Sequence, residues 1–170
     1  MDILPTLLDA GVKVRLQAGR ADFERVVAQA HAVLAGREAS GDEPEVVIEN
    51  FIDDMAGAYA WADLVLARAG ATTLAEVTAA GKPSLLIPFP FATHDHQTVN
   101  AAFLAKAGAA RSVAQKDLPG IDLAGTVIGL LGDPARLDAM GRAALGQALP
   151  NAADDIARAL LAMASRKGER

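Results

Sequence analysis

Short apolar runs alternate with longer segments of helical spacing along the first two thirds of the chain. Candidate strands lie at 12–16, 46–48, 64–66, 84–87 and 110–113. Glycine, proline or aspartate stands at the junctions, as turns and helix starts prefer. Repeated strand–helix units predict an α/β fold, a Rossmann-like parallel sheet flanked by helices. Ligands of such sheets bind at the carboxyl ends of the strands.

Apolar residues recur at helical spacing in the segments between and after these strands. Helices are expected at 3–10, 23–34, 53–61, 72–80, 95–106, 123–131, 134–148 and 152–164. The helix at 3–10 opens the chain, so the first strand–helix unit lacks its strand. Because the first strand is central in a Rossmann-like sheet, its absence predicts neighbouring strands with unpaired edges.

The composition narrows the class of protein. We expect residues 1–170 to form a single domain, because this length buries a core of its own and 52% of the residues are hydrophobic. The absence of cysteine excludes disulfide scaffolds, thiolate zinc sites and cysteine nucleophiles. A net charge of −5 without a basic stripe argues against nucleic acid as a partner. No apolar run is long enough for a membrane span and no signal-peptide pattern opens the chain, so we expect a cytoplasmic protein.

The first candidate site follows the strand at 46–48. Phe51 could cover a flat ring, while the Ile52 backbone offers one donor and one acceptor to the edge of that ring. The alternative is a core phenylalanine ahead of a helix capped by aspartate. Composition alone favours this alternative.

The second candidate site is the turn around Gly70. A glycine turn that leads into a helix presents free N–H groups and a positive dipole end, which suit a phosphate. Thr73 adds a hydroxyl, and Glu76 shares the helix face of Thr72 and Thr73, where it could accept both hydroxyls of a ribose. Thr73-x-x-Glu76 is equally a capping box, in which Glu76 would only accept a backbone N–H.

The third candidate site follows the most apolar strand. Asp95, His96 and Gln97 lie at an expected helix start and could reach sugar hydroxyls. His94, Asp95 and His96 are residue types that can ligate a metal, but the only other histidine, His31, belongs to a different helix. We therefore expect no metal site.

Three segments taken together resemble the MurG family of bacterial glycosyltransferases. They lie at 51–64, 68–83 and 88–101, and the similarity extends from about Gln17 to the segment at 133–137. The resemblance implies the C-terminal, donor-binding half of a two-domain GT-B enzyme. That enzyme is an inverting hexosyltransferase that moves N-acetylglucosamine from UDP-N-acetylglucosamine to lipid I and forms lipid II in peptidoglycan synthesis.

The resemblance also implies a role for each matching position. Phe51 and Ile52 would hold the uracil, the turn at 70–73 the diphosphate and Glu76 the ribose, while the residues at 95–97 would hold the sugar. The predicted substrate-binding set is Phe51, Ile52, Arg68, Gly70, Ala71, Thr72, Thr73, Glu76, Asp95, His96, Gln97 and Asn100. His96 departs from the family pattern, in which many relatives carry glutamine. The family implies no cofactor, and its catalytic residues belong to the N-terminal domain.

The resemblance covers only the donor-binding half of the family enzyme. We expect the chain to bind UDP-N-acetylglucosamine and to be inactive alone, because the lipid I acceptor site and the proposed base lie in the other domain. Two alternatives remain, the soluble donor-binding subunit of a split N-acetylglucosaminyltransferase and a non-catalytic nucleotide-binding module. Unpaired strand edges would allow a homodimer by strand exchange or edge pairing. The resemblance places the full-length enzyme at the cytoplasmic face of the inner membrane as a peripheral protein.

Overall fold

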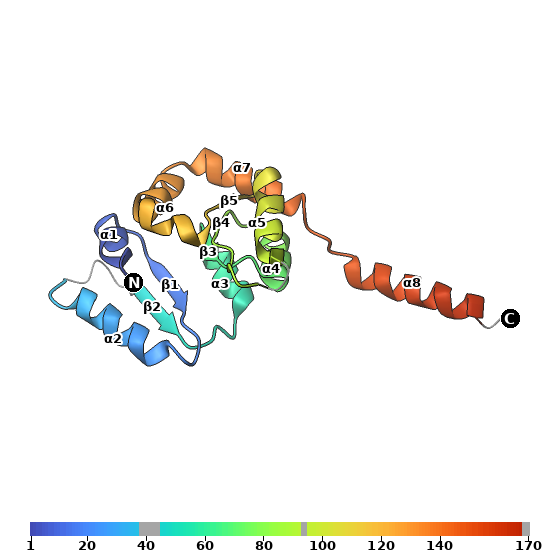
Figure 1. The fold of residues 1–170 in the computed structure, drawn as a ribbon, viewed down its shortest axis with the longest axis horizontal. Helices are drawn as coiled ribbons and strands as arrows, with labels where there is room; N and C mark the ends of the chain where they lie inside the picture. The colour runs from blue at the N-terminus through green and yellow to red at the C-terminus, as the bar shows by residue number, and fades with distance from the viewer. Residues whose placement is uncertain (38–44, 93–94, 168–170) are drawn as a thin grey trace.

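The computed structural model describes residues 1–37, 45–92 and 95–167 of this α/β chain. Its strands form two parallel sheets (Figure 1). The strands are β1 (Val14–Gln17), β2 (Val46–Glu49), β3 (Val65–Ala67), β4 (Ser84–Leu86) and β5 (Ala110–Ser112). β1 pairs with β2 in one sheet, and the other has the order β3-β4-β5. The predicted parallel strands are confirmed, each within one or two residues of its expected bounds.

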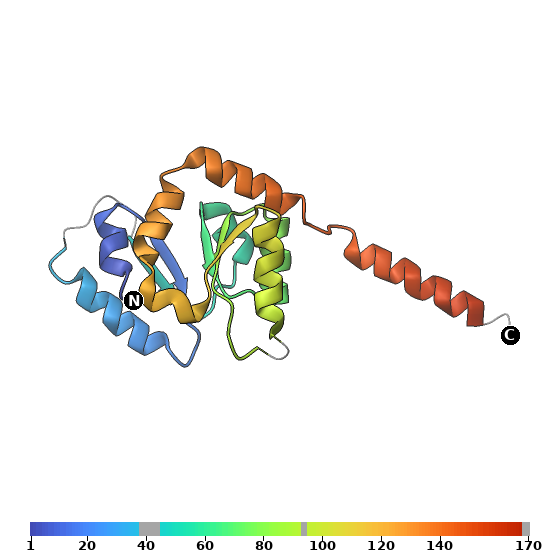
Figure 2. The ribbon, with the colours of Figure 1, turned by 45° about the horizontal axis from the view of Figure 1, so that its top comes forward.

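Helices cover both faces of the sheet β3-β4-β5 (Figure 2). The described helices are α1 (Leu4–Asp9), α2 (Phe23–Leu34), α3 (Met55–Trp61), α4 (Ala71–Ala79), α5 (His96–Lys106), the 3-10 helix η2 (Gln115–Gly120), α6 (Leu123–Leu131), α7 (Pro134–Leu145) and α8 (Ala152–Lys167). The aspartate cap predicted before α3 is confirmed, because Asp54 accepts a 2.9 Å hydrogen bond from the Gly57 N–H.

The core is built around β4, all of whose residues are buried. Successive side chains of a strand point to opposite faces of the sheet. Leu86 accordingly packs with Ala101 and Leu104 of α5, whereas Leu85 packs with Leu7 of α1 and Val127 of α6. The continuous apolar run at 84–87 is explained by this burial on both faces.

The two sheets are not hydrogen-bonded to each other within the described residues. β1 pairs only with β2 and β3 only with β4, so each keeps an edge without a ladder partner. Val14 of β1 and Leu64, which precedes β3, nevertheless pack in the same apolar cluster. At the open edge of β3, Leu66 is 47% exposed, unusually high for a leucine in the middle of a strand. The unpaired edges expected from the sequence are present.

The C-terminal third departs from the sequence prediction at two points. The helix expected over 134–148 ends at Leu145, because Gly146 follows as its C-cap. The 3-10 helix η2 has no counterpart among the helices expected from the sequence. α8 extends away from the other elements, with Ile156, Leu160 and Met163 exposed (Figure 1). Among the described residues, no helix combines the length and apolarity needed to cross a membrane.

Candidate functional site

Side-chain hydrogen bonds connect the elements that follow β2, β3 and β4. The Tyr59 hydroxyl of α3 donates to Glu76 of α4 at 2.9 Å. Asn100 of α5 donates from Nδ2 to the Ala69 carbonyl at 3.0 Å, just before α4. Arg68 donates to the carbonyls after β4. The three candidate junctions of the sequence are thus linked in one region, at the carboxyl ends of the strands.

Phe51 and Ile52 differ sharply in burial. Phe51 is 59% exposed, so its interpretation as a core residue is wrong. Ile52 is 7% exposed, and its N–H donates to Gln17 Oε1 at 3.0 Å. The donor expected at Ile52 is therefore already engaged, while no described residue donates to its carbonyl oxygen.

Gln17 is a residue of this region that the sequence analysis did not single out. It ends β1, and the parallel register sets it beside Glu49, the last residue of β2. This places the Gln17 amide next to the loop that carries Phe51 and Ile52. Only the pairing of β1 with β2 reveals this position, since 35 residues separate Gln17 from Ile52.

An ion pair also joins β1 and β2. Arg15 Nε lies 2.6 Å from Glu49 Oε2, and the hydrogen bond from Arg15 lowers the pKa of Glu49. Both side chains remain about a quarter exposed, so solvent screens the pair and its contribution to stability is small.

α4 begins at Ala71 with Gly70 as its N-cap, and Gly70 provides no side-chain cap. The first N–H groups of a helix have no partner inside that helix, and they lie at its positive dipole end. Thr73 lies inside the helix instead of at its N-cap. The capping-box interpretation of Thr73 and Glu76 is therefore wrong.

Glu76 is half-buried and receives its hydrogen bond on Oε2 from Tyr59. Burial and the neighbouring Glu76 carboxylate raise the pKa of the Tyr59 hydroxyl well above its ordinary value, so it stays protonated and donates at neutral pH. Among the described residues, none donates to Glu76 Oε1, which leaves that oxygen open to a ligand.

Side chains from the second and third junctions form hydrogen bonds with the backbone that follows β4. Arg68 Nη1 donates to the Ile87 and Pro88 carbonyls at 3.2 and 3.3 Å, and its guanidinium lies 5.6 Å from the centre of the Phe89 ring. Gln97 Oε1 accepts from the Phe89 N–H at 3.0 Å, which leaves the two donors of its amide nitrogen. In this structure, two predicted binding residues, Arg68 and Asn100, support the loops through backbone carbonyls.

Asp95 and His96 are exposed at the start of α5. Asp95 has a left-handed backbone with φ 53°, and its carboxylate accepts a 2.6 Å hydrogen bond from the Thr98 hydroxyl. His94 lies outside the described residues. Within the described part of the chain, no group of three side chains that could ligate a metal is found.

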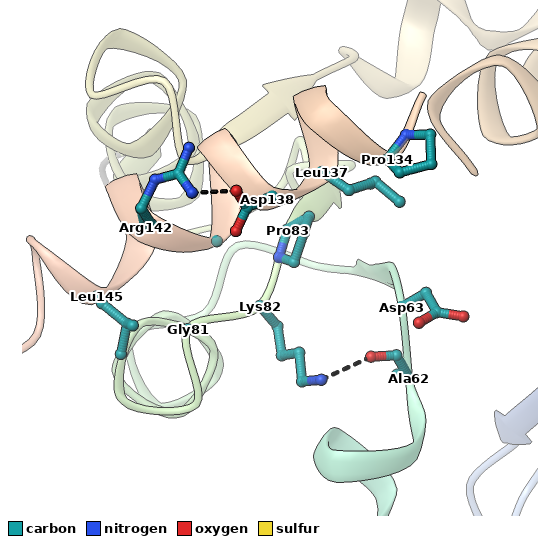
Figure 3. Close-up of a pocket in the computed structure, with 11 residues that line it drawn as sticks. Ala62, Asp63, Gly81, Lys82, Pro83, Pro134, Leu137, Asp138, Arg142 and Leu145 are labelled. Atoms are coloured by element: carbon teal, nitrogen blue, oxygen red, sulfur yellow. Dashed lines mark hydrogen bonds and ion pairs between the residues drawn. The ribbon is translucent and has the colours of Figure 1, made fainter. Parts of the chain in front are cut away.

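A separate hollow of about 370 Å³ lies at the opposite end of β4 (Figure 3). Lys82, which precedes β4, donates from Nζ to the Ala62 carbonyl at 2.8 Å and so caps the end of α3. On the side of the hollow formed by α7, Arg142 forms an ion pair with Asp138. Lys82 and Arg142 thus bind groups of the chain itself. None of the residues predicted to bind a ligand lines this hollow.

Comparison with known proteins identifies the family. The model of the glycosyltransferase family 28 C-terminal domain matches residues 3–156. The chain belongs to this family. All 170 residues align at 91% identity with 46% of a Solidesulfovibrio magneticus protein named UDP-N-acetylglucosamine–N-acetylmuramyl-(pentapeptide) pyrophosphoryl-undecaprenol N-acetylglucosamine transferase. A Nitratidesulfovibrio vulgaris protein of the same name is 51% identical over 150 residues, 88% of this chain and 39% of that protein.

A solved structure supports the same assignment. The crystal structure of Acinetobacter baumannii MurG superposes with a TM-score of 0.67 at 34% identity, over 90% of this chain and 43% of that one. The predicted resemblance to the MurG family and the predicted Rossmann-like fold are therefore confirmed. The chain spans about half the length of the relatives it matches.

Proposed function

We propose that the chain is the donor-binding half of a family 28 glycosyltransferase and binds UDP-N-acetylglucosamine. The named relatives are N-acetylglucosamine transferases that act on a lipid-linked N-acetylmuramyl pentapeptide. The observation that carries the proposal is Glu76, a carboxylate held by a buried tyrosine with one oxygen open, one turn into the helix that follows β3. A carboxylate is the acceptor group that suits a pair of ribose hydroxyls.

The neighbouring groups suit the other parts of the donor. The exposed ring of Phe51 offers a stacking surface for uracil, and the Ile52 carbonyl offers an acceptor for the uracil N–H. The N-terminus of α4 at Gly70, Ala71, Thr72 and Thr73 suits the diphosphate, because N–H groups and the helix dipole both favour an anion. The sugar is assigned to Asp95, His96 and Gln97.

Calorimetric titration tests this proposal. UDP and UDP-N-acetylglucosamine should bind the chain with saturation. ADP has a larger, two-ring base that carries its N–H donor at a different distance from the ribose, so it should bind at least about tenfold more weakly. Equal affinity for UDP and ADP, or no heat from any of the three at millimolar concentration, would contradict the assignment.

We propose that residues 1–170 act as one nucleotide-sugar-binding domain of a longer cytoplasmic enzyme, peripheral on the inner membrane, that converts lipid I to lipid II. The acceptor site and the catalytic base then come from the remaining half. The chain alone should give no transfer from UDP-N-acetylglucosamine to lipid I, and measurable turnover would refute this division of labour.

We further propose that the open edges of β1 and β3 allow two copies of the chain to associate. Unpaired parallel edges with an exposed Leu66 are a template for pairing with another strand. Light scattering should give a mass above that of the monomer at high concentration, and Leu66→Lys should reduce it, because a charge blocks edge pairing. A monomer at every concentration would exclude association.

A further inference from the structure

Tyr59 is a buried residue whose hydroxyl contacts the proposed site, and the binding scheme gives it no role. It is 9% exposed, and its hydroxyl lies 2.9 Å from Glu76 Oε2. The two residues come from different helices, 17 positions apart in the chain. The contact therefore depends on where the fold places α3 relative to α4 and not on a local feature of either helix.

The geometry fixes a side chain that would otherwise be free to rotate. Glutamate on a helix surface has several rotatable bonds, whereas a buried tyrosine ring is held by packing. The Asp54 cap anchors the first turn of α3, directly before Tyr59. The hydroxyl thus holds one carboxylate oxygen of Glu76 at a defined point. A carboxylate accepts up to about four hydrogen bonds, so one from Tyr59 leaves capacity for two hydroxyls of a ligand.

We propose that Tyr59 is a positioning residue that orients the Glu76 carboxylate for the ribose and thereby sets the preference for ribose over 2′-deoxyribose. This inference rests on the proposed function. A carboxylate held in one orientation can meet the 2′ and 3′ hydroxyls together. A freely rotating carboxylate meets either one with little discrimination between the two sugars.

The test compares UDP with 2′-deoxy-UDP on the unmodified chain and on Tyr59→Phe. The unmodified chain should prefer UDP, and Tyr59→Phe should reduce the ratio of the two affinities about three- to tenfold, which corresponds to the usual net contribution of one hydrogen bond. A purely structural role would alter folding stability without changing this ratio. Thermal unfolding of each variant establishes that the folded chain is being titrated.

Thr78→Val is the matched control. Like Tyr59, Thr78 is buried, but it belongs to α4. Its hydroxyl donates to the carbonyl oxygens of Leu74 and Ala75 at 2.8 and 3.0 Å. Its replacement removes a buried hydroxyl without touching Glu76, so the ratio of UDP to 2′-deoxy-UDP affinity should stay at its original value.

A double-mutant cycle of Tyr59→Phe and Glu76→Ala tests the positioning role of Tyr59 separately from the binding of UDP. If Tyr59 acts through Glu76, Tyr59→Phe should have no further effect on UDP affinity once Glu76 is alanine. If Glu76→Ala abolishes the ribose preference while Tyr59→Phe preserves it, the positioning role is wrong and the proposed function stands. If the unmodified chain binds UDP no better than ADP, the proposed function fails and the role of Tyr59 with it.

Discussion

Gly141→Ala should lower the free energy of unfolding by about 2 kcal/mol, within the range for overpacking a tight core. A β-carbon built on Gly141 would lie 2.7 Å from the carbonyl oxygen of Gly81. That oxygen belongs to the backbone of the turn before β4, so it cannot move aside as a flexible side chain would. Gly81 itself has φ +61°, a left-handed conformation that constrains the turn further.

Gly129→Ala is the matched control for this prediction. Gly129 also lies inside a helix, α6, and a β-carbon there would meet no atom within 4 Å. Alanine should therefore raise the free energy of unfolding by about 0.5–1 kcal/mol, the usual gain for replacing a helical glycine. Urea denaturation of both variants gives the comparison. Stabilisation by both substitutions would show that α7 does not approach the turn at Gly81 as closely as the structure has it.

The elements of the fold could be predicted because their signals are local. The run at 84–87 is apolar without interruption because both faces of β4 are covered, and the cap of α3 needs only Asp54 and the three residues that follow it. The parallel pairing within both sheets followed from the repeated strand–helix units. Local pattern and topology rules carry such inferences.

The contacts of the site could not be predicted because they depend on how elements pack. The partner of Tyr59 is fixed by the position of α3 relative to α4, and the partner of the Ile52 N–H by the register of β1 against β2. Composition favoured a buried Phe51, since large apolar side chains are usually inside. The structure exposes it because Ile52, the next residue, takes the buried position.

Glu76→Ala should weaken the binding of UDP about ten- to a hundredfold, since it removes charge-assisted hydrogen bonds to the ribose that are each worth more than neutral ones. Glu76→Gln should have a smaller effect, because its amide oxygen still accepts. Asp154→Ala, at the exposed start of α8, the helix that extends away from the other elements, removes the same charge and should leave the affinity unchanged (Figure 1).

Whether Glu76→Ala weakens or strengthens the binding of UDP distinguishes a hydrogen-bonding carboxylate from one that only repels the ligand. UDP is an anion, so removing a negative charge close to it should by itself strengthen binding, most clearly at low ionic strength. If Glu76→Ala loses affinity, the hydrogen bonds of the carboxylate must contribute more binding free energy than is gained when its repulsion of the diphosphate is removed. Titrations at two salt concentrations make the distinction, with folding checked because the change also deprives the Tyr59 hydroxyl of its acceptor. Tighter binding by Glu76→Ala at low salt would mean that the carboxylate only repels the diphosphate, and the ribose contact would have to be abandoned.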